Sequence, residues 1–211
     1  MTRQCLVVPH DQFIAQRRLK KREAVGLVVH ELAHVVRAVS GRRQALKLLG
    51  SGLASYQRGE EGVATFLEQQ VTGARGHARM LRHLAASYSL GVLDARPRPF
   101  GEVFVFVREL LQSRYRKEQD EELLDHEVWR ICVRLFRGCS PHSASIVLTS
   151  PIIYREGNAC VWDLASRNDR EMRRLLSGKY DPGNAVHQRA MDELGIYTGP
   201  QIDLDNLLVG L

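Results

Sequence analysis

Two histidines and a glutamate lie inside an otherwise apolar stretch near the N-terminus, VVHELAHVV at residues 28–36. Residues four apart on a helix share a face, so His30 and His34 can bring their ring nitrogens to one ion. Glu31, beside the first histidine, can take a proton from a water on that ion without binding the ion itself. This is the His-Glu-x-x-His (HExxH) pattern of helical zinc peptidase sites. The alternative interpretation is three polar core residues, each with a partner inside the protein.

A catalytic zinc site needs a third protein ligand besides the two histidines, and a position left open for water. The sequence offers Glu60 and Glu61 in RGEEGVATFLEQQ, at the start of the next long helical pattern. We favour Glu61, because Gly62 follows it and a small residue there lets two packed helices approach closely. A glutamate in the first turn of a second helix is typical of the glutamate-type zincins. Glu60 is expected to act only as a first-turn acid that favours the helix dipole, and the reverse assignment stays open.

Most of the chain has the periodicity of amphipathic helices, and these helices must position the candidate ligands. The helix that carries the histidines is expected to run from residue 12 or 15 to residue 40 and to stop at Gly41 in a left-handed conformation. Further helices are expected at 43–53, 59–73, 75–90, 101–115, 121–138, 159–167, 169–177 and 184–194. Short strands are expected at 4–9 and 144–157, with Pro151 interrupting the second. The sequence therefore predicts a mainly α protein of the α+β class, folded as a single domain over residues 1–211.

Charge, apolar patterning and cysteine usage limit the classes of protein. The 211 residues carry a net charge of +6, which favours acidic partners, but no motif of a nucleic-acid-binding module accompanies it, so nucleic acid is not the expected partner. No apolar run approaches eighteen residues and no signal-peptide core is present, so we expect no membrane span and a cytoplasmic protein. The cysteines form no CxxC pair and are expected to be reduced thiols: Cys5, Cys132, Cys139 and Cys160.

Residues 30–70 resemble the metallopeptidase family of the microtubule-associated tyrosine carboxypeptidases, whose bacterial members are named for a QEGLA motif. Here that motif reads EEGVA, at residues 60–64. Segments at 128–141, 147–157 and 172–196 are similar to further family segments in the same order, so the resemblance extends from about residue 4 to residue 200. It implies a zincin-like enzyme with one Zn²⁺ per chain that removes a C-terminal residue, typically an aromatic one, from a protein or peptide.

Carried over residue by residue, the resemblance implies that His30, His34 and Glu61 are the zinc ligands. It implies that Glu31 is the general base. The family usually has one more residue between its two histidines, so this chain has the commoner zincin spacing instead.

The resemblance also implies a substrate-binding wall that includes Arg137 and Tyr154. A lysine and an aspartate of the family pattern are replaced here by Ser150 and Pro151. A carboxypeptidase needs a cation for the terminal carboxylate of its substrate, and a bidentate arginine serves best. We therefore expect Arg137, and after it Arg155, to bind that carboxylate, while Tyr154 or an arginine stabilises the oxyanion.

Two other functions stay open at this stage. One is a zinc metalloendopeptidase that uses the same site to cut inside chains. The other is a non-catalytic basic binding protein with a degenerate zinc site.

Overall fold

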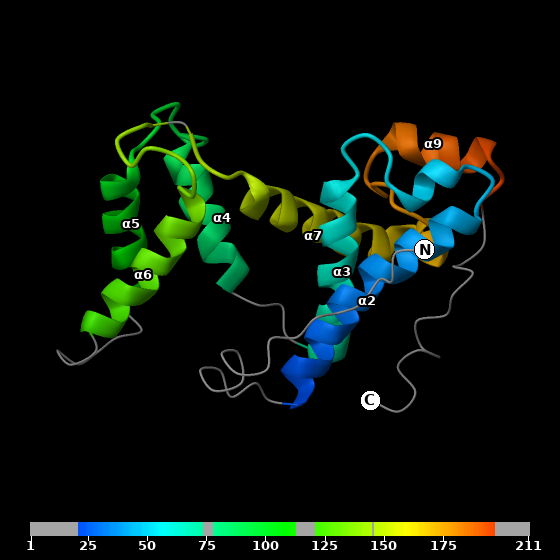
Figure 1. The fold of residues 1–211 in the computed structure, drawn as a ribbon, viewed down its shortest axis with the longest axis horizontal. Coiled ribbons are helices and arrows are strands. Elements are labelled where there is room, and N and C mark those ends of the chain that lie inside the picture. Colours follow the sequence, from blue (N-terminus) through cyan, green and yellow to red (C-terminus); the bar gives the residue numbers. More distant parts are fainter. Residues whose placement is uncertain (1–20, 74–77, 113–120, 145, 197–211) are drawn as a thin grey trace. The chain divides into compact units, whose positions relative to one another are not determined.

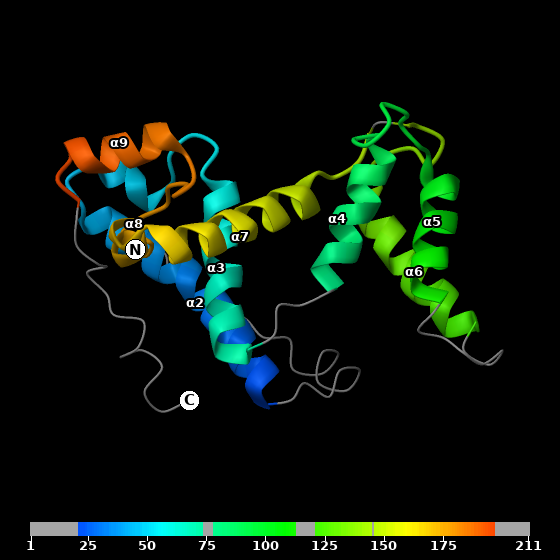
Figure 2. The ribbon, with the colours of Figure 1, turned by 180° about the vertical axis from the view of Figure 1, so that it is seen from behind.

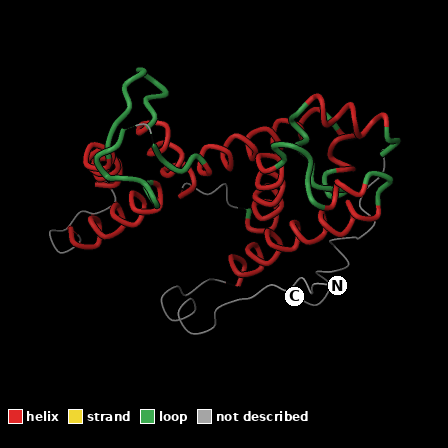
Figure 3. Tube along the Cα trace, turned by 45° about the horizontal axis from the view of Figure 1, so that its top comes forward, coloured by secondary structure: helices red, strands yellow, loops and turns green. Residues whose placement is uncertain are grey.

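Helices and loops make up everything that the computed structural model describes, namely residues 21–73, 78–112, 121–144 and 146–196 (Figure 3). No strand occurs in these residues. The prediction of a mainly α protein is therefore confirmed. The chain divides into two compact units, one formed by Met1–Arg75 with Glu156–Leu211 and the other by Gly76–Arg155. The single domain expected over residues 1–211 stays a prediction.

The first unit contains the two helices that carry the candidate ligands. Helix α2 (Lys21–Arg43) and helix α3 (Gln57–Thr72) lie side by side, and the short 3-10 helix η1 (Lys47–Gly50) lies between them in the chain (Figures 1 and 2). The unit also contains most of α7 (Ser150–Arg167), followed by α8 (Asp169–Arg174) and α9 (Ala185–Glu193). Both histidines and both candidate glutamates therefore belong to this unit.

Helix α2 continues past Gly41 to Arg43, so the predicted left-handed stop at Gly41 is wrong. The glycine is needed for a different reason, because a Cβ at Gly41 would collide with the carbonyl group of Leu49 in η1. Glu23 in the first turn and Arg42 with Arg43 in the last turn complement the helix dipole. The predicted start of this helix, at residue 12 or 15, lies outside the described residues.

By length and composition alone, helix α2 is long and apolar enough to cross a membrane. Half of its most apolar 18-residue window is buried inside the structure, and the core helix of a soluble protein or a signal sequence passes the same test. Its polar side chains His30 and Arg37 have partners on α3, and Arg37 is fully buried. The sequence expectation of no membrane span therefore stays a prediction.

Helix α3 ends as predicted at Gly73, which has a φ of 65° and donates its N–H to the carbonyl of Gln69. Gly62 makes the close helix approach that the sequence predicted, but its partner is α7 and not α2. A Cβ on Gly62 would collide with the backbone of Gly157. The close approach of α2 to α3 occurs instead at Gly26, where a Cβ would collide with a side chain of α3.

The strand region predicted at 144–157 is wrong from Ser150 onward, because helix α7 begins there. Residues 146–149 belong to no strand either. Pro151 lies in the first helical turn, where its missing N–H costs no helical hydrogen bond. A short apolar run beside a proline therefore marked a helix start and not a strand. The strand predicted at 4–9 lies outside the described residues.

The second unit, where described, contains three of the predicted helices, α4 (Ala78–Ser89), α5 (Phe100–Gln112) and α6 (Glu121–Leu135), and the first residues of α7 (Figure 2). Buried residues at four-residue spacing on α5 and α6 form its core: Val103, Val107 and Leu111, with Leu124, Val128 and Cys132. Burial raises the pKa of the Cys132 thiol to about 12, so this thiol stays protonated and unreactive. Cys132, Cys139 and Cys160 are free thiols, as predicted, and Cys5 lies outside the described residues.

The last two helices begin within one residue of the predicted positions, and each has an asparagine cap. The side chains of Asn168 and Asn184 accept hydrogen bonds from the first turns of α8 and α9. The segment between these helices runs along η1, where Lys179 N–H donates to the carbonyl of Leu49 (2.7 Å) and Leu53 N–H donates to the carbonyl of Lys179 (3.0 Å). These bonds fix Lys179 beside the helices of the candidate site.

Candidate metal centre

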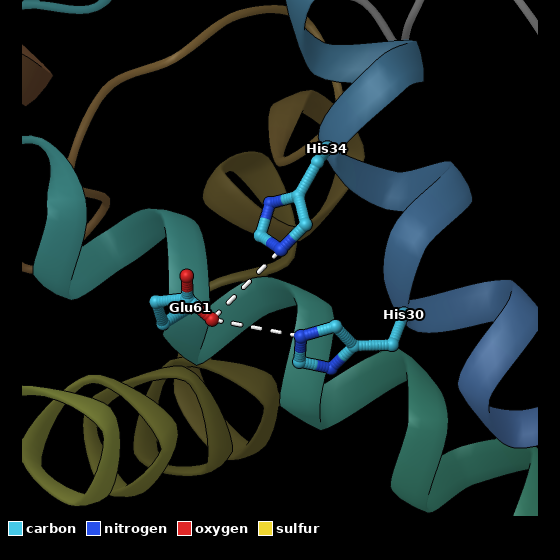
Figure 4. A group of neighbouring side chains, drawn as sticks. All are labelled: His30, His34 and Glu61. Atoms are coloured by element: carbon cyan, nitrogen blue, oxygen red, sulfur yellow. Dashed lines mark ion pairs between the residues drawn. The ribbon is translucent and has the colours of Figure 1, made fainter. Parts of the chain in front are cut away.

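Three side chains from two helices converge on one point in the first unit. Figure 4 shows His30 and His34 reaching from α2 and Glu61 reaching from α3 toward them. The Nε2 atoms of His30 and His34 lie 3.5 and 3.8 Å from the same carboxylate oxygen, Oε2 of Glu61. Both histidines also have carboxylate partners inside the protein, as the polar-core alternative requires, and the convergence on one oxygen is what makes this group a candidate metal centre.

The arrangement fits one small divalent ion. One ligand atom from each of His30, His34 and Glu61 lies within 4.8 Å of the others. Ligand atoms about 2.0–2.1 Å from a tetrahedral ion are about 3.3–3.4 Å apart, so the separations of 3.5 and 3.8 Å need only a small closure. Two imidazole nitrogens and one carboxylate oxygen leave a fourth position open, as in catalytic zinc sites.

The other ring nitrogen of each histidine faces a second carboxylate. His30 Nδ1 lies 3.0 Å from Oε2 of Glu68, and His34 Nδ1 lies 3.0 Å from Oε1 of Glu60. In the tautomer that donates from Nδ1, a neutral imidazole satisfies an ionised carboxylate at that position and keeps its lone pair on Nε2. The lone pairs that face Glu61 are therefore the ones available to a metal.

Glu60 is almost fully buried, with 5% of its surface exposed, and two cations surround it. Arg37 Nη1 lies 2.9 Å from its Oε2, and Lys179 Nζ lies 3.1 Å from its Oε1. Burial raises the pKa of the Glu60 carboxyl, but the charge of Arg37, the hydrogen bond from His34 and the charge of Lys179 outweigh it, so this pKa is lowered. Glu60 is therefore a buried, paired carboxylate and not only a first-turn acid.

Sequence reasoning missed four residues of this cluster: Arg37, Glu60 as a histidine partner, Glu68 and Lys179. Helical spacing held a signal for two of them, since Arg37 follows His34 by one turn and Glu68 follows Glu61 by two turns. No local pattern indicates Lys179, which comes from a segment more than a hundred residues away in the chain.

The remaining predicted site residues, namely the general base and the substrate-binding residues, are outside the group of three candidate ligands. Glu31 lies on α2, half-buried, next to His30. Arg137 is exposed, and Tyr154 and Arg155 are half-buried; all three belong to the second unit. The general base and the substrate-binding residues therefore stay predictions.

Fold and site together define a helical protein whose candidate metal centre has the His-His-Glu donor set of metallopeptidases. The family model of the microtubule-associated tyrosine carboxypeptidases matches residues 12–207, which is nearly the whole chain. The chain belongs to this family, and its membership implies a carboxypeptidase that acts on the C-terminus of a protein. Comparisons with curated proteins and with solved structures give no match.

Proposed function

We propose that this protein is a zinc-dependent carboxypeptidase that removes a C-terminal tyrosine or phenylalanine from a protein or peptide. The observation that carries the proposal is the convergence of His30 Nε2 and His34 Nε2 on one oxygen of Glu61. Nitrogen and oxygen ligands with an open fourth position suit Zn²⁺. The net charge of +6 favours a substrate with an acidic tail.

The proposed catalytic and substrate-binding residues each have a separate task in the reaction. Zinc, when bound, polarises the scissile carbonyl and lowers the pKa of water. Glu31 accepts a proton from the attacking water and donates it to the leaving amine. Tyr154 donates a hydrogen bond to the oxyanion that develops on the carbonyl oxygen. Arg137 or Arg155 pairs with the terminal carboxylate and so selects the last residue of the substrate.

Matched peptides test the proposed reaction. The zinc-loaded protein is expected to release the last residue of a peptide that ends in tyrosine, and to leave the amidated twin intact, because only the free carboxylate pairs with an arginine. Mass spectrometry of both digests measures this. Equal cleavage of the two peptides inside the chain would establish the endopeptidase instead. A protein that takes up no zinc, cuts neither peptide and binds DNA in a salt-dependent way would be the non-catalytic alternative.

Single alanine variants identify the residue that binds the substrate carboxylate. Arg137→Ala, or Arg155→Ala if that residue is the anchor, is expected to lower kcat/KM on the free peptide about 10- to 100-fold, mainly through KM, because a charged hydrogen bond is worth about 1.5–3 kcal/mol. Arg134→Ala is the control. Arg134 is an exposed arginine in the last turn of α6, three residues before Arg137. Unchanged kinetics in both Arg137 and Arg155 variants would show that another cation binds the carboxylate.

A further inference from the structure

We infer that Glu60 and Glu68 are positioning residues that hold the two metal-binding histidines in the Nδ1–H tautomer, and that Arg37 and Lys179 hold Glu60 in place. The inference rests on the proposed function, because it concerns the same zinc site. It assigns a role to four residues outside the group of three proposed ligands.

The two carboxylates approach the histidines from the side opposite the proposed metal. Glu60 and Glu68 contact Nδ1 atoms, while Glu61 faces the Nε2 atoms. The nitrogens of an imidazole point in different directions from the ring, so a carboxylate on Nδ1 does not share an ion with Nε2. A hydrogen bond from Nδ1–H fixes the orientation of the ring and raises the basicity of Nε2 toward a metal.

Glu68 lies close to Gly26, at the contact between α2 and α3. Gly26 lies one turn before His30 on α2, and a Cβ at this position would lie 3.4 Å from Cγ of Glu68 and collide with Thr72. The clash is with Thr72 alone, since 3.4 Å is an ordinary contact, so the Glu68 side chain lies against this position where it reaches His30 Nδ1. The Glu68 side chain keeps 27% of its surface exposed.

Glu60 is held more firmly, because it forms the centre of a buried charge cluster. Its two oxygens contact Arg37 (2.9 Å) and Lys179 (3.1 Å) in addition to His34 (3.0 Å). These contacts fix the carboxylate from three sides, so its position does not depend on the metal.

Arg37 connects this cluster to the C-terminal part of the chain. Its Nε donates to the carbonyl of Gly178 (2.9 Å) and its Nη2 donates to the carbonyl of Tyr180 (2.6 Å). Lys179 lies between these two residues and pairs with the backbone of η1. The segment 178–180 therefore holds both cations of Glu60, and through Glu60 it fixes the orientation of His34.

The test measures the histidine tautomers and the zinc affinity separately. In the metal-free protein, at a pH where the rings are neutral, long-range ¹H–¹⁵N NMR is expected to show Nδ1–H for both histidines. Glu60→Ala is expected to change this signal for His34 alone, and Glu68→Ala for His30 alone. The inference is overturned if a variant leaves the tautomer of its own histidine unchanged, or if it changes the tautomer of the other histidine instead.

Zinc affinity, measured by competition with a chelator, is expected to fall about 10- to 100-fold in each of these two variants. Glu60→Gln and Glu68→Gln are expected to lose less, because the amide oxygen still accepts from Nδ1–H. Glu61→Ala is expected to lose more than either, since it removes a ligand, and Glu193→Ala, at an exposed glutamate of α9, is expected to change nothing. Lys179→Met is expected to weaken zinc binding in the same direction as Glu60→Ala.

The outcomes separate this inference from the proposed function. If the unaltered protein binds no zinc, the proposed function fails, while the NMR experiment on the metal-free protein still decides the tautomers. If it binds zinc and both alanine variants bind equally tightly, the inference fails and the zinc site stands. Glu68 is half-buried, so its alanine variant decides the question even where Glu60→Ala does not fold.

Discussion

Glu31→Gln is expected to lower kcat by about 10²- to 10⁴-fold on a peptide with a free C-terminal tyrosine, with little change in bound zinc. Glutamine has nearly the shape of glutamate, but its amide does not accept the proton of the attacking water. Glu31 lies beside His30 on α2 and is absent from the group of three ligands, so the metal site is expected to survive the change. Kinetics under saturating substrate and elemental analysis of the same preparation measure both quantities.

A matched control separates loss of the base from general damage. Glu109 is an exposed glutamate on α5, in the second unit, and Glu109→Gln is expected to keep full activity. If Glu31→Gln retains activity, Glu31 is not the base. If it loses zinc in proportion to activity, Glu31 belongs to the metal site itself.

Arg37→Met is expected to destabilise the metal-free protein by about 3–5 kcal/mol, because it leaves Glu60 as a buried carboxylate without its main cation. Arg37 is fully buried and donates to two backbone carbonyls besides pairing with Glu60, so each of those carbonyls loses one hydrogen bond as well. Urea unfolding of protein freed of metal measures the change without a contribution from metal binding.

Two comparisons make this prediction specific. Arg167→Met removes an arginine that pairs with Asp163 on the surface of α7, and it is expected to cost less than about 1 kcal/mol. The double variant Arg37→Met with Glu60→Gln is expected to recover part of the loss, because the uncompensated charge is gone. A loss for Arg37→Met as small as that for Arg167→Met would contradict the role of Arg37 as the main support of Glu60.

The sequence predicted the helical architecture better than it predicted the ends and crossings of the helices. Apolar periodicity located α3, α5 and α6, because a helix that packs on one side must repeat its apolar residues at helical spacing. It failed at Ser150–Gly157, where the apolar run is too short to have a readable period. It also misassigned Gly41 and the partner of Gly62, because a glycine permits a turn and a close contact equally well.

By itself the sequence determined the candidate ligand pair on one helix, since the helical repeat alone brings His30 and His34 to the same face. The structure brings Glu61 to these two histidines because α2 and α3 pack side by side, and its role as a ligand stays a prediction. Only the tertiary structure decided which ring nitrogen of each histidine faces Glu61 and which one faces a second carboxylate. That depends on Glu60 and Glu68 across the helix interface and on Lys179 from a distant segment, and contacts between such distant residues leave no periodic trace in a sequence.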